Sequence, residues 1–162
     1  MLALRAIFFT FLLPGTVTVW IPRMILAGEK ARPEPGSWRW AGTPLMAAGA
    51  AVLIACIVDF ARKGRGTLAP IDPPRNLVVV GLYRYVRNPM YVGVVTTLIG
   101  EALFFESRSI GIYAAAAWLL FHLWVVIYEE PHLEGTFGAE YEQYRDAVPR
   151  WIPRLRPAEP IS

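Results

Sequence analysis

The chain has 162 residues, of which 55% are hydrophobic and 18% are charged, and its formal net charge at neutral pH is +3. Average soluble domains are about 45–50% apolar and about 25% charged, so this composition argues against a disordered chain, a coiled coil and a nucleic-acid-binding protein. The length fits a single domain. The one cysteine, Cys56, excludes an intrachain disulfide framework and a cysteine-cluster zinc site.

Four apolar stretches predict membrane-spanning helices over residues 2–21, 43–61, 90–105 and 110–128. A spanning helix needs about 20 apolar residues, and all but the short third stretch reach that length. The first stretch has no A-x-A-type cleavage site, so we interpret it as a helix kinked at Pro14 rather than a signal peptide. Four such stretches leave too few residues to coat a soluble core. We therefore expect an all-α, multi-pass membrane bundle that forms one domain.

The distribution of basic residues predicts how the bundle is oriented. With four spans, the N-terminus, the loop 62–89 and the tail 129–162 share one side, which carries 11 of the 16 lysine and arginine residues. The positive-inside rule places both termini and this loop in the cytoplasm, as expected for an inner or cytoplasmic membrane protein. The polar residues gather on the same side, so we expect any chemistry there.

The sequence supports neither a dinucleotide-binding motif nor a metal site. Residues 64–69 match G-x-G-x-x-A, but the dinucleotide-binding motif needs a strand before it and a helix after it. Here a spanning helix precedes the motif and Pro70 follows it. The only histidines, His122 and His132, lack metal-ligand spacing, so we expect no metal.

Residues 81–93 predict an anion site at the start of the third span. Asn88 is suited to cap the helix and Pro89 to its first position. Free backbone N–H groups would then face the cytoplasm beside Arg84, Arg87 and several tyrosines, a combination that favours anions. Plain membrane anchoring, with arginines on lipid phosphates and tyrosines in the interfacial belt, is the alternative.

Glu129 and Glu130 are predicted to lie at the cytoplasmic end of the fourth span. Two adjacent carboxylates repel each other, and the negative end of a helix dipole disfavours both, so we expect Arg84, Arg87 or a cationic ligand to offset them. His122 precedes Glu129 by seven residues on nearly the same helix face, which suggests the lining of a site. A solvated helix end is the alternative.

The tail predicts an amphipathic helix that lies on the membrane surface or caps the bundle. The apolar positions at helical spacing are Leu133, Phe137, Tyr141, Tyr144 and Val148. Together, the arginines before the third span, the acids at the end of the fourth span and the aromatic residues of this tail helix suit a zwitterionic ligand with an aromatic base, such as S-adenosylmethionine. NAD(P)H would also use arginines and aromatic side chains, so both ligands stay open at this point.

A family resemblance rests on three short runs of sequence. The first is Arg87-Asn88-Pro89-Met90-Tyr91-Val92-Gly93. About 35 residues later follow Glu129-Glu130-Pro131-His132-Leu133 and Phe137-Gly138-Ala139-Glu140-Tyr141. The chain resembles the integral-membrane methyltransferases, meaning isoprenylcysteine carboxyl methyltransferase and its phospholipid N-methyltransferase relatives, over residues 78–153. The resemblance implies S-adenosylmethionine as methyl donor and a lipid-like acceptor from the bilayer, either a prenylcysteine carboxylate or a related small lipophilic molecule. The alternatives are a phospholipid amine as acceptor, or an NAD(P)H-dependent membrane reductase of the sterol-reductase type.

The resemblance also implies site residues. The expected cofactor-binding residues are Tyr83, Arg87, Asn88, Pro89, Tyr91, Gly93, Glu129, Glu130 and Tyr141. The candidate catalytic residues are Glu129, Arg145 and Arg150. Glu129, or alternatively His122, would take a proton from an amine or thiol acceptor. Arg145 or Arg150 would face a substrate carboxylate, because this chain has Ala147 where the prenylcysteine enzymes are expected to have arginine. Asn88 also departs from the family pattern, since many carboxyl methyltransferases have histidine there.

Overall fold

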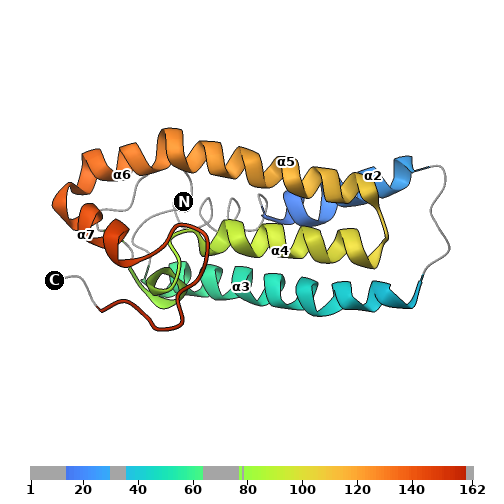
Figure 1. Cartoon of the computed structure of the whole chain (residues 1–162), viewed down its shortest axis with the longest axis horizontal. Coiled ribbons are helices and arrows are strands. Elements are labelled where there is room, and N and C mark those ends of the chain that lie inside the picture. Colours follow the sequence, from blue (N-terminus) through green and yellow to red (C-terminus); the bar gives the residue numbers. More distant parts are fainter. Residues whose placement is uncertain (1–13, 30–35, 64–76, 78, 160–162) are drawn as a thin grey trace.

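A computed structural model describes residues 14–29, 36–63, 77 and 79–159, and all regular structure in these ranges is helical. The elements in chain order are η1 (Thr16–Trp20), α2 (Ile21–Gly28), η2 (Ser37–Ala41), α3 (Gly42–Lys63), η3 (Gly81–Arg84), α4 (Pro89–Phe104), α5 (Arg108–Trp124), η4 (Val125–Glu129), α6 (Glu130–Phe137) and α7 (Ala139–Ala147). Figure 1 shows α3, α4 and α5 running along one elongated bundle, with α2 beside α5 at the end away from α7.

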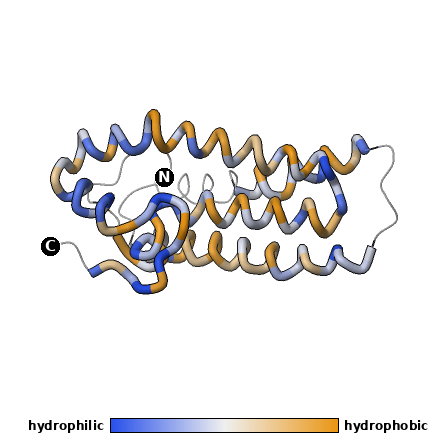
Figure 2. Tube along the Cα trace, viewed as in Figure 1, coloured by the Kyte–Doolittle hydropathy of each residue, from blue (hydrophilic) through white to orange (hydrophobic). Residues whose placement is uncertain are grey.

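Among the described residues, two helices are long and apolar enough to cross a membrane, Ser37–Asp59 with 23 residues and Arg108–Phe137 with 30. The helices Thr16–Gly28 and Pro89–Phe104 are also apolar but shorter. Along the bundle the residues are mainly hydrophobic, whereas α6 and α7 are rich in hydrophilic residues (Figure 2). The described part of the chain is therefore all-helical with two candidate spans, and the four-span arrangement stays a prediction.

The first helix differs from its prediction at its C-terminal end. Residues 2–13 of the predicted span lie outside the described part of the chain. The described helix continues to Gly28, seven residues past the predicted end at 21. Its backbone forms a π-helical turn before Pro22, in which Ile21 N–H bonds five residues back to the Thr16 carbonyl. Such a turn accommodates the N–H that Pro22 lacks.

Glycines set the close contact between α3 and α4. Gly42 and Gly49 lie seven residues apart on α3, as do Gly93 and Gly100 on α4, so each pair lies on one helix face. A Cβ added to Gly49 would lie 2.6 Å from the Gly93 carbonyl oxygen, and one added to Gly100 would lie 2.6 Å from the backbone nitrogen of Met46. The two backbones therefore approach as closely as in the small-residue interfaces of membrane helices.

The fourth helix does not end at residue 128 as predicted. It continues through the π turn η4 into α6 and ends at Phe137, followed by Gly138 with a φ of +52°. Pro131 does not stop it because the π turn comes just before the proline: Glu130 N–H bonds five residues back to the Val125 carbonyl, so the helix continues past the N–H that Pro131 lacks. Glu129 and Glu130 thus lie inside a continuous helix, and the expected conflict with the negative end of a helix dipole does not arise.

The predicted tail helix is divided at Gly138. Its positive φ, which glycine adopts at low cost, turns the chain between α6 and α7. The apolar positions nevertheless cluster as their spacing predicts. Tyr141, Tyr144 and Val148 are buried, and Leu133 and Phe137 pack against them.

We predict that Gly49→Val destabilises the bundle by about 1–3 kcal/mol, because the new side chain overpacks the α3–α4 contact. Gly111→Ala is the matched control, since a Cβ there meets only Ala102 Cβ at 3.9 Å. It should be neutral or stabilising, because alanine is favoured over glycine in helices. Thermal unfolding in detergent, followed by circular dichroism, measures both changes. Equal midpoints for the two variants would refute the close contact.

Candidate functional site

The segment before α4 is paired with the C-terminal segment 148–158, which we call the strap. The backbone bonds run from Arg87 N–H to the Pro149 carbonyl (2.9 Å), from Arg154 N–H to the Tyr85 carbonyl (3.0 Å) and from Ala158 N–H to the Arg84 carbonyl (2.9 Å). Segments that lie more than 60 residues apart are thereby held together beside the first turn of α4.

Two side chains reinforce this pairing in ways that the sequence did not predict. Arg84 does not offset the acids, because its Nε donates to the Ala158 carbonyl at 2.8 Å. Asn88 occupies the N-cap position of α4, but its side chain makes no capping hydrogen bond. Its Nδ2 instead donates to the Arg150 carbonyl at 3.2 Å. The predicted capping role of the Asn88 side chain is therefore wrong, and this amide helps to fix the strap.

The centre of the site is Glu130, whose carboxylate binds two arginines. Arg87 Nη1 donates to Oε1 at 2.8 Å, and Arg150 donates through Nε to Oε1 and through Nη2 to Oε2, both at 2.7 Å. The Arg87 and Glu130 side chains are only 9% and 13% exposed, so this pair is largely shielded from water. The hydrogen bonds to Glu130 raise the pKa of the Arg150 guanidinium above its usual value.

Two tyrosines of α7 complete this side of the site. Arg87 Nη1 also donates to the Tyr141 hydroxyl at 3.2 Å, and the Tyr144 hydroxyl donates to the Tyr83 carbonyl at 2.8 Å. Burial raises the pKa of the Tyr141 and Tyr144 phenols, so both remain neutral at physiological pH. They supply hydrogen bonds and aromatic surface without adding charge.

Glu129 differs from its neighbour in its partners. One of its oxygens, Oε2, accepts a hydrogen bond from the Tyr91 hydroxyl at 3.2 Å, and Tyr91 stacks on Phe121 with ring centroids 4.7 Å apart. Within the described residues no arginine or lysine forms an ion pair with Glu129. None of the described cations therefore balances the negative charge of this carboxylate directly.

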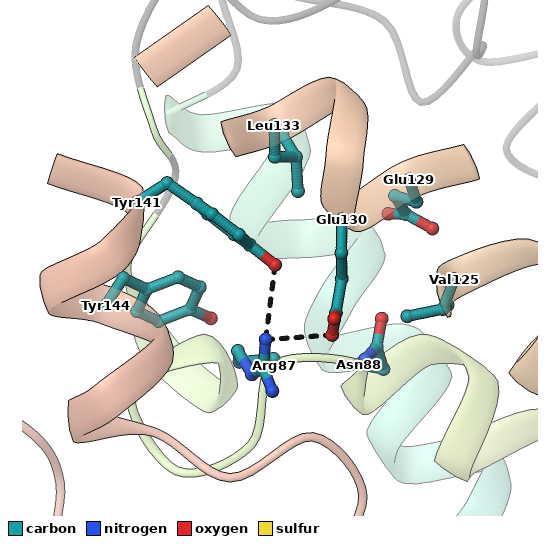
Figure 3. A pocket seen from close by; sticks show the side chains of 8 residues that line it. All are labelled: Arg87, Asn88, Val125, Glu129, Glu130, Leu133, Tyr141 and Tyr144. Carbon is teal, nitrogen blue, oxygen red and sulfur yellow. Dashed lines mark hydrogen bonds and ion pairs between the residues drawn. The ribbon is translucent and has the colours of Figure 1, made fainter. Parts of the chain in front are cut away.

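A small pocket lies where these groups meet, as Figure 3 shows. The lining residues are Arg87, Asn88, Val125, Glu129, Glu130, Leu133, Tyr141 and Tyr144. Its volume is about 30 Å³, enough for about one water molecule. Pockets for small molecules usually measure about 300–1,000 Å³, so a nucleotide-sized ligand requires this one to widen.

One of the arginines that line the pocket has a donor without a described partner. Arg87 Nε is buried and has no hydrogen-bond partner among the described residues. Buried polar groups are rarely left without a partner, and such exceptions often mark a ligand site. Within the described part of the chain, the pocket lining therefore includes a cation with one unpaired donor, Arg87, and an anion without a cationic partner, Glu129.

The structure brings most of the predicted site residues together. Five of the predicted cofactor-binding residues line the pocket, namely Arg87, Asn88, Glu129, Glu130 and Tyr141. Tyr91 lies next to it through its bond to Glu129, and Arg150 through its bonds to Glu130.

The other predicted residues lie elsewhere. Tyr83 takes part through its backbone carbonyl, and Pro89 is buried in the first turn of α4. Gly93 faces α3, where an added Cβ would lie 3.0 Å from Val52 Cγ1. Arg145 forms a half-exposed ion pair with Glu134 at 3.2 Å, outside the pocket lining.

Sequence reasoning missed three lining residues and one anchoring contact. Val125 and Leu133 lie four residues before and after Glu129, so helical spacing alone could have placed them on its face. Tyr144 belonged to the predicted apolar stripe but was not proposed as a site residue. His122 accepts a hydrogen bond from Trp151 Nε1 at 3.1 Å, and no local sequence signal pointed to that contact.

Within the described residues, no three histidine, cysteine, aspartate or glutamate side chains gather in a group that could hold a metal ion.

We predict that Glu130→Gln lowers the free energy of unfolding by about 3 kcal/mol, because two largely desolvated arginines lose their shared counter-charge. Glu134→Gln, which removes the half-exposed partner of Arg145, should cost at most about 1 kcal/mol. Chemical denaturation in detergent would compare them. A Glu130 variant as stable as the Glu134 variant would show that Glu130 does not hold the site together.

Comparison with known proteins identifies the family. Residues 38–140 match the family described as phospholipid methyltransferase. Over 80 residues the chain is 38% identical to the Protein-S-isoprenylcysteine O-methyltransferase of Schizosaccharomyces pombe, a match that covers 49% of this chain and 34% of that protein. The chain thus aligns with about a third of that curated relative's length. No solved structure gives a significant match. Because the family match extends over more than half of its residues, the chain belongs to the phospholipid methyltransferase family.

Proposed function

We propose that the chain is an integral-membrane methyltransferase that uses S-adenosylmethionine to methylate a lipid-like acceptor. The observation that carries this proposal is the pocket between the start of α4, the helix α5–α6 and α7. Among the described residues, Glu129 has no cationic partner there and Arg87 Nε has no hydrogen-bond partner. Family membership supports the reaction class. The printed name of the yeast relative supports a prenylcysteine carboxylate or a related lipophilic acceptor.

The donor set of the pocket fits a zwitterionic cofactor. When bound, S-adenosylmethionine supplies an electrophilic methyl group on a positively charged sulfur. In this proposal Glu129 attracts the cationic part of the ligand, and Arg87 Nε donates to its carboxylate. Tyr141 offers an aromatic face at the same wall.

Glu130 has a different role in this proposal. Its carboxylate already binds Arg87 and Arg150, so in this proposal it positions these arginines and does not contact the cationic part of the cofactor. Arg150 is then placed to orient an acceptor carboxylate. Arg145, which is paired with Glu134 away from the pocket, is the weaker candidate for that role.

Methyl transfer from S-adenosylmethionine requires little covalent chemistry from the protein itself. Methyl transfer is an in-line displacement with an activated leaving group, so the chain contributes orientation and a dry, charge-matched site. A carboxylate acceptor is already anionic at neutral pH and needs no base. A phospholipid amine, the second acceptor class, must lose a proton, and Glu129 is the pocket carboxylate available to take it.

A nicotinamide-dependent reductase is not favoured. The family assignment points to methyl transfer. An unpaired Glu129 carboxylate would also repel the phosphates of a dinucleotide. The membrane orientation drawn from the basic residues, with both termini and the pocket on the cytoplasmic side, is part of this proposal.

We predict that Glu129→Gln weakens binding of S-adenosylmethionine by about 10- to 100-fold, because a charge-assisted contact contributes about 1.5–3 kcal/mol. Isothermal titration calorimetry on the detergent-solubilised protein measures the dissociation constant. Glu142→Gln, on the exposed face of α7, is the matched control and should bind like the unaltered chain. No heat with the cofactor, together with binding of NADPH, would overturn the methyltransferase assignment.

Ala147→Arg tests the acceptor class. Ala147 ends α7 with an exposed side chain, so an arginine fits there without repacking. If a prenylcysteine carboxylate is the acceptor, the added cation should raise turnover on a prenylcysteine analogue several-fold by favouring the anionic substrate. Transfer of radiolabelled methyl groups measures this rate. An unchanged rate with the prenylcysteine analogue, alongside turnover of a phospholipid amine, would favour the second acceptor class.

A further inference from the structure

The tip of the strap reaches the surface of a membrane-spanning helix. Trp151 donates from Nε1 to His122 Nδ1 at 3.1 Å, and its ring lies against those of His122 and Trp118, with centroids 5.9 Å and 6.5 Å apart. Both partners belong to α5, inside the candidate span Arg108–Phe137. The strap therefore does not simply trail into water after α7.

Helix geometry gives the depth of this contact. His122 lies 14 residues after Arg108, which corresponds to about 21 Å along the helix axis. The hydrocarbon core of a bilayer is about 30 Å thick. If the charged residue at the start of α5 marks one boundary of that core, Trp151 meets His122 about 9 Å inside the opposite boundary.

Next to this contact the strap carries large apolar side chains that the protein leaves uncovered. Leu155 is 99% exposed and Ile152 is 79% exposed. Two arginines, Arg154 and Arg156, flank Leu155 and are also exposed. Apolar side chains beside arginines are typical of segments that lie in the headgroup region of a membrane.

The backbone of the strap is suited to a poorly hydrated place. Non-helical chain is tolerated at membrane depth only where its polar groups are satisfied. Pro149, Pro153 and Pro157 have no N–H to satisfy. Arg154 and Ala158 donate their N–H groups to the segment before α4, and the Pro149 and Arg150 carbonyls accept bonds from it.

We infer that the strap is a membrane-interface anchor whose partner is an anionic lipid surface. Ile152 and Leu155 enter the acyl region of the leaflet on the pocket side, and Arg154 and Arg156 bind lipid phosphates there. Because Arg150 lies in the same strap and binds Glu130, the bilayer helps to set the position of a pocket arginine. This inference does not depend on the identity of the cofactor or on methyl transfer.

Depth-dependent quenching tests the inference with the full chain in lipid vesicles. Leu155→Cys is labelled with an environment-sensitive fluorophore, while the native Cys56 is fully buried and gives the labelling blank. Lipids carrying nitroxide groups should quench this label within about twofold of a label at Leu120→Cys, on the lipid-exposed face of α5. A label at Gln143→Cys, on the exposed polar face of α7, should be quenched much less.

The arginines are tested by lipid charge. Replacing part of the phosphatidylcholine with phosphatidylglycerol should increase quenching at Leu155, and the double change Arg154→Gln and Arg156→Gln should remove that increase. Arg108→Gln, which removes an exposed charge at the opposite end of the bundle, should leave it intact. Quenching at Leu155 no stronger than at Gln143 would overturn the anchor. An increase that survives loss of both strap arginines would overturn the lipid-phosphate contact.

Discussion

The structure of the site depends on one carboxylate shared by two arginines. Glu130 belongs to the long helix, Arg87 to the segment before α4 and Arg150 to the strap, so their hydrogen bonds join three separate parts of the chain. Desolvating three charges is costly, and such a cluster is favourable only when its geometry is good and every member is paired. The backbone bonds between the strap and the segment before α4 contribute the geometry, because they hold the two chain segments that carry Arg87 and Arg150 next to each other.

The packing of the bundle explains why this cluster can form where it does. The glycines between α3 and α4 allow close backbone contact, and Gly81, whose φ is +53°, places η3 against Asp59 near the end of α3. The segment from Gly81 to Asn88 is therefore fixed against α3 before α4 begins. Arg87, at the end of this segment, points to the helix α5–α6 because Asn88 and Pro89 start α4 directly after it. Packing far from the pocket thus determines the position of its principal cation.

The sequence predicted the residue classes of the site better than their contacts. Periodicity identified the apolar stripe from Leu133 to Val148, because burial follows spacing even though Gly138 interrupts the helix. The predicted end at residue 128 failed because Glu129, Glu130 and Pro131 usually accompany a helix end, whereas a π turn lets the helix continue here. Gly93 was expected at the pocket because a motif does not reveal which face of α4 a small residue takes. The bonds of Arg84 and Asn88 to strap carbonyls could not be predicted, because they depend on where a distant segment folds back.

Glu129 and Glu130 are adjacent in the sequence, but they have different partners because their side chains leave the helix in different directions. Adjacent side chains on a helix point about 100° apart, so one can face the arginines while the other faces the next helix. Glu130 is paired with Arg87 and Arg150, whereas the one polar side chain that bonds to Glu129 among the described residues is the uncharged hydroxyl of Tyr91. If both acids were paired with arginines, the pocket would lose its uncompensated negative charge and with it any preference for a cation. If neither were paired, their repulsion and desolvation would destabilise the fold. The unequal pairing is therefore compatible with a stable structure, and among the described residues it leaves one carboxylate without a cationic partner, which is the feature on which the proposed cofactor binding rests.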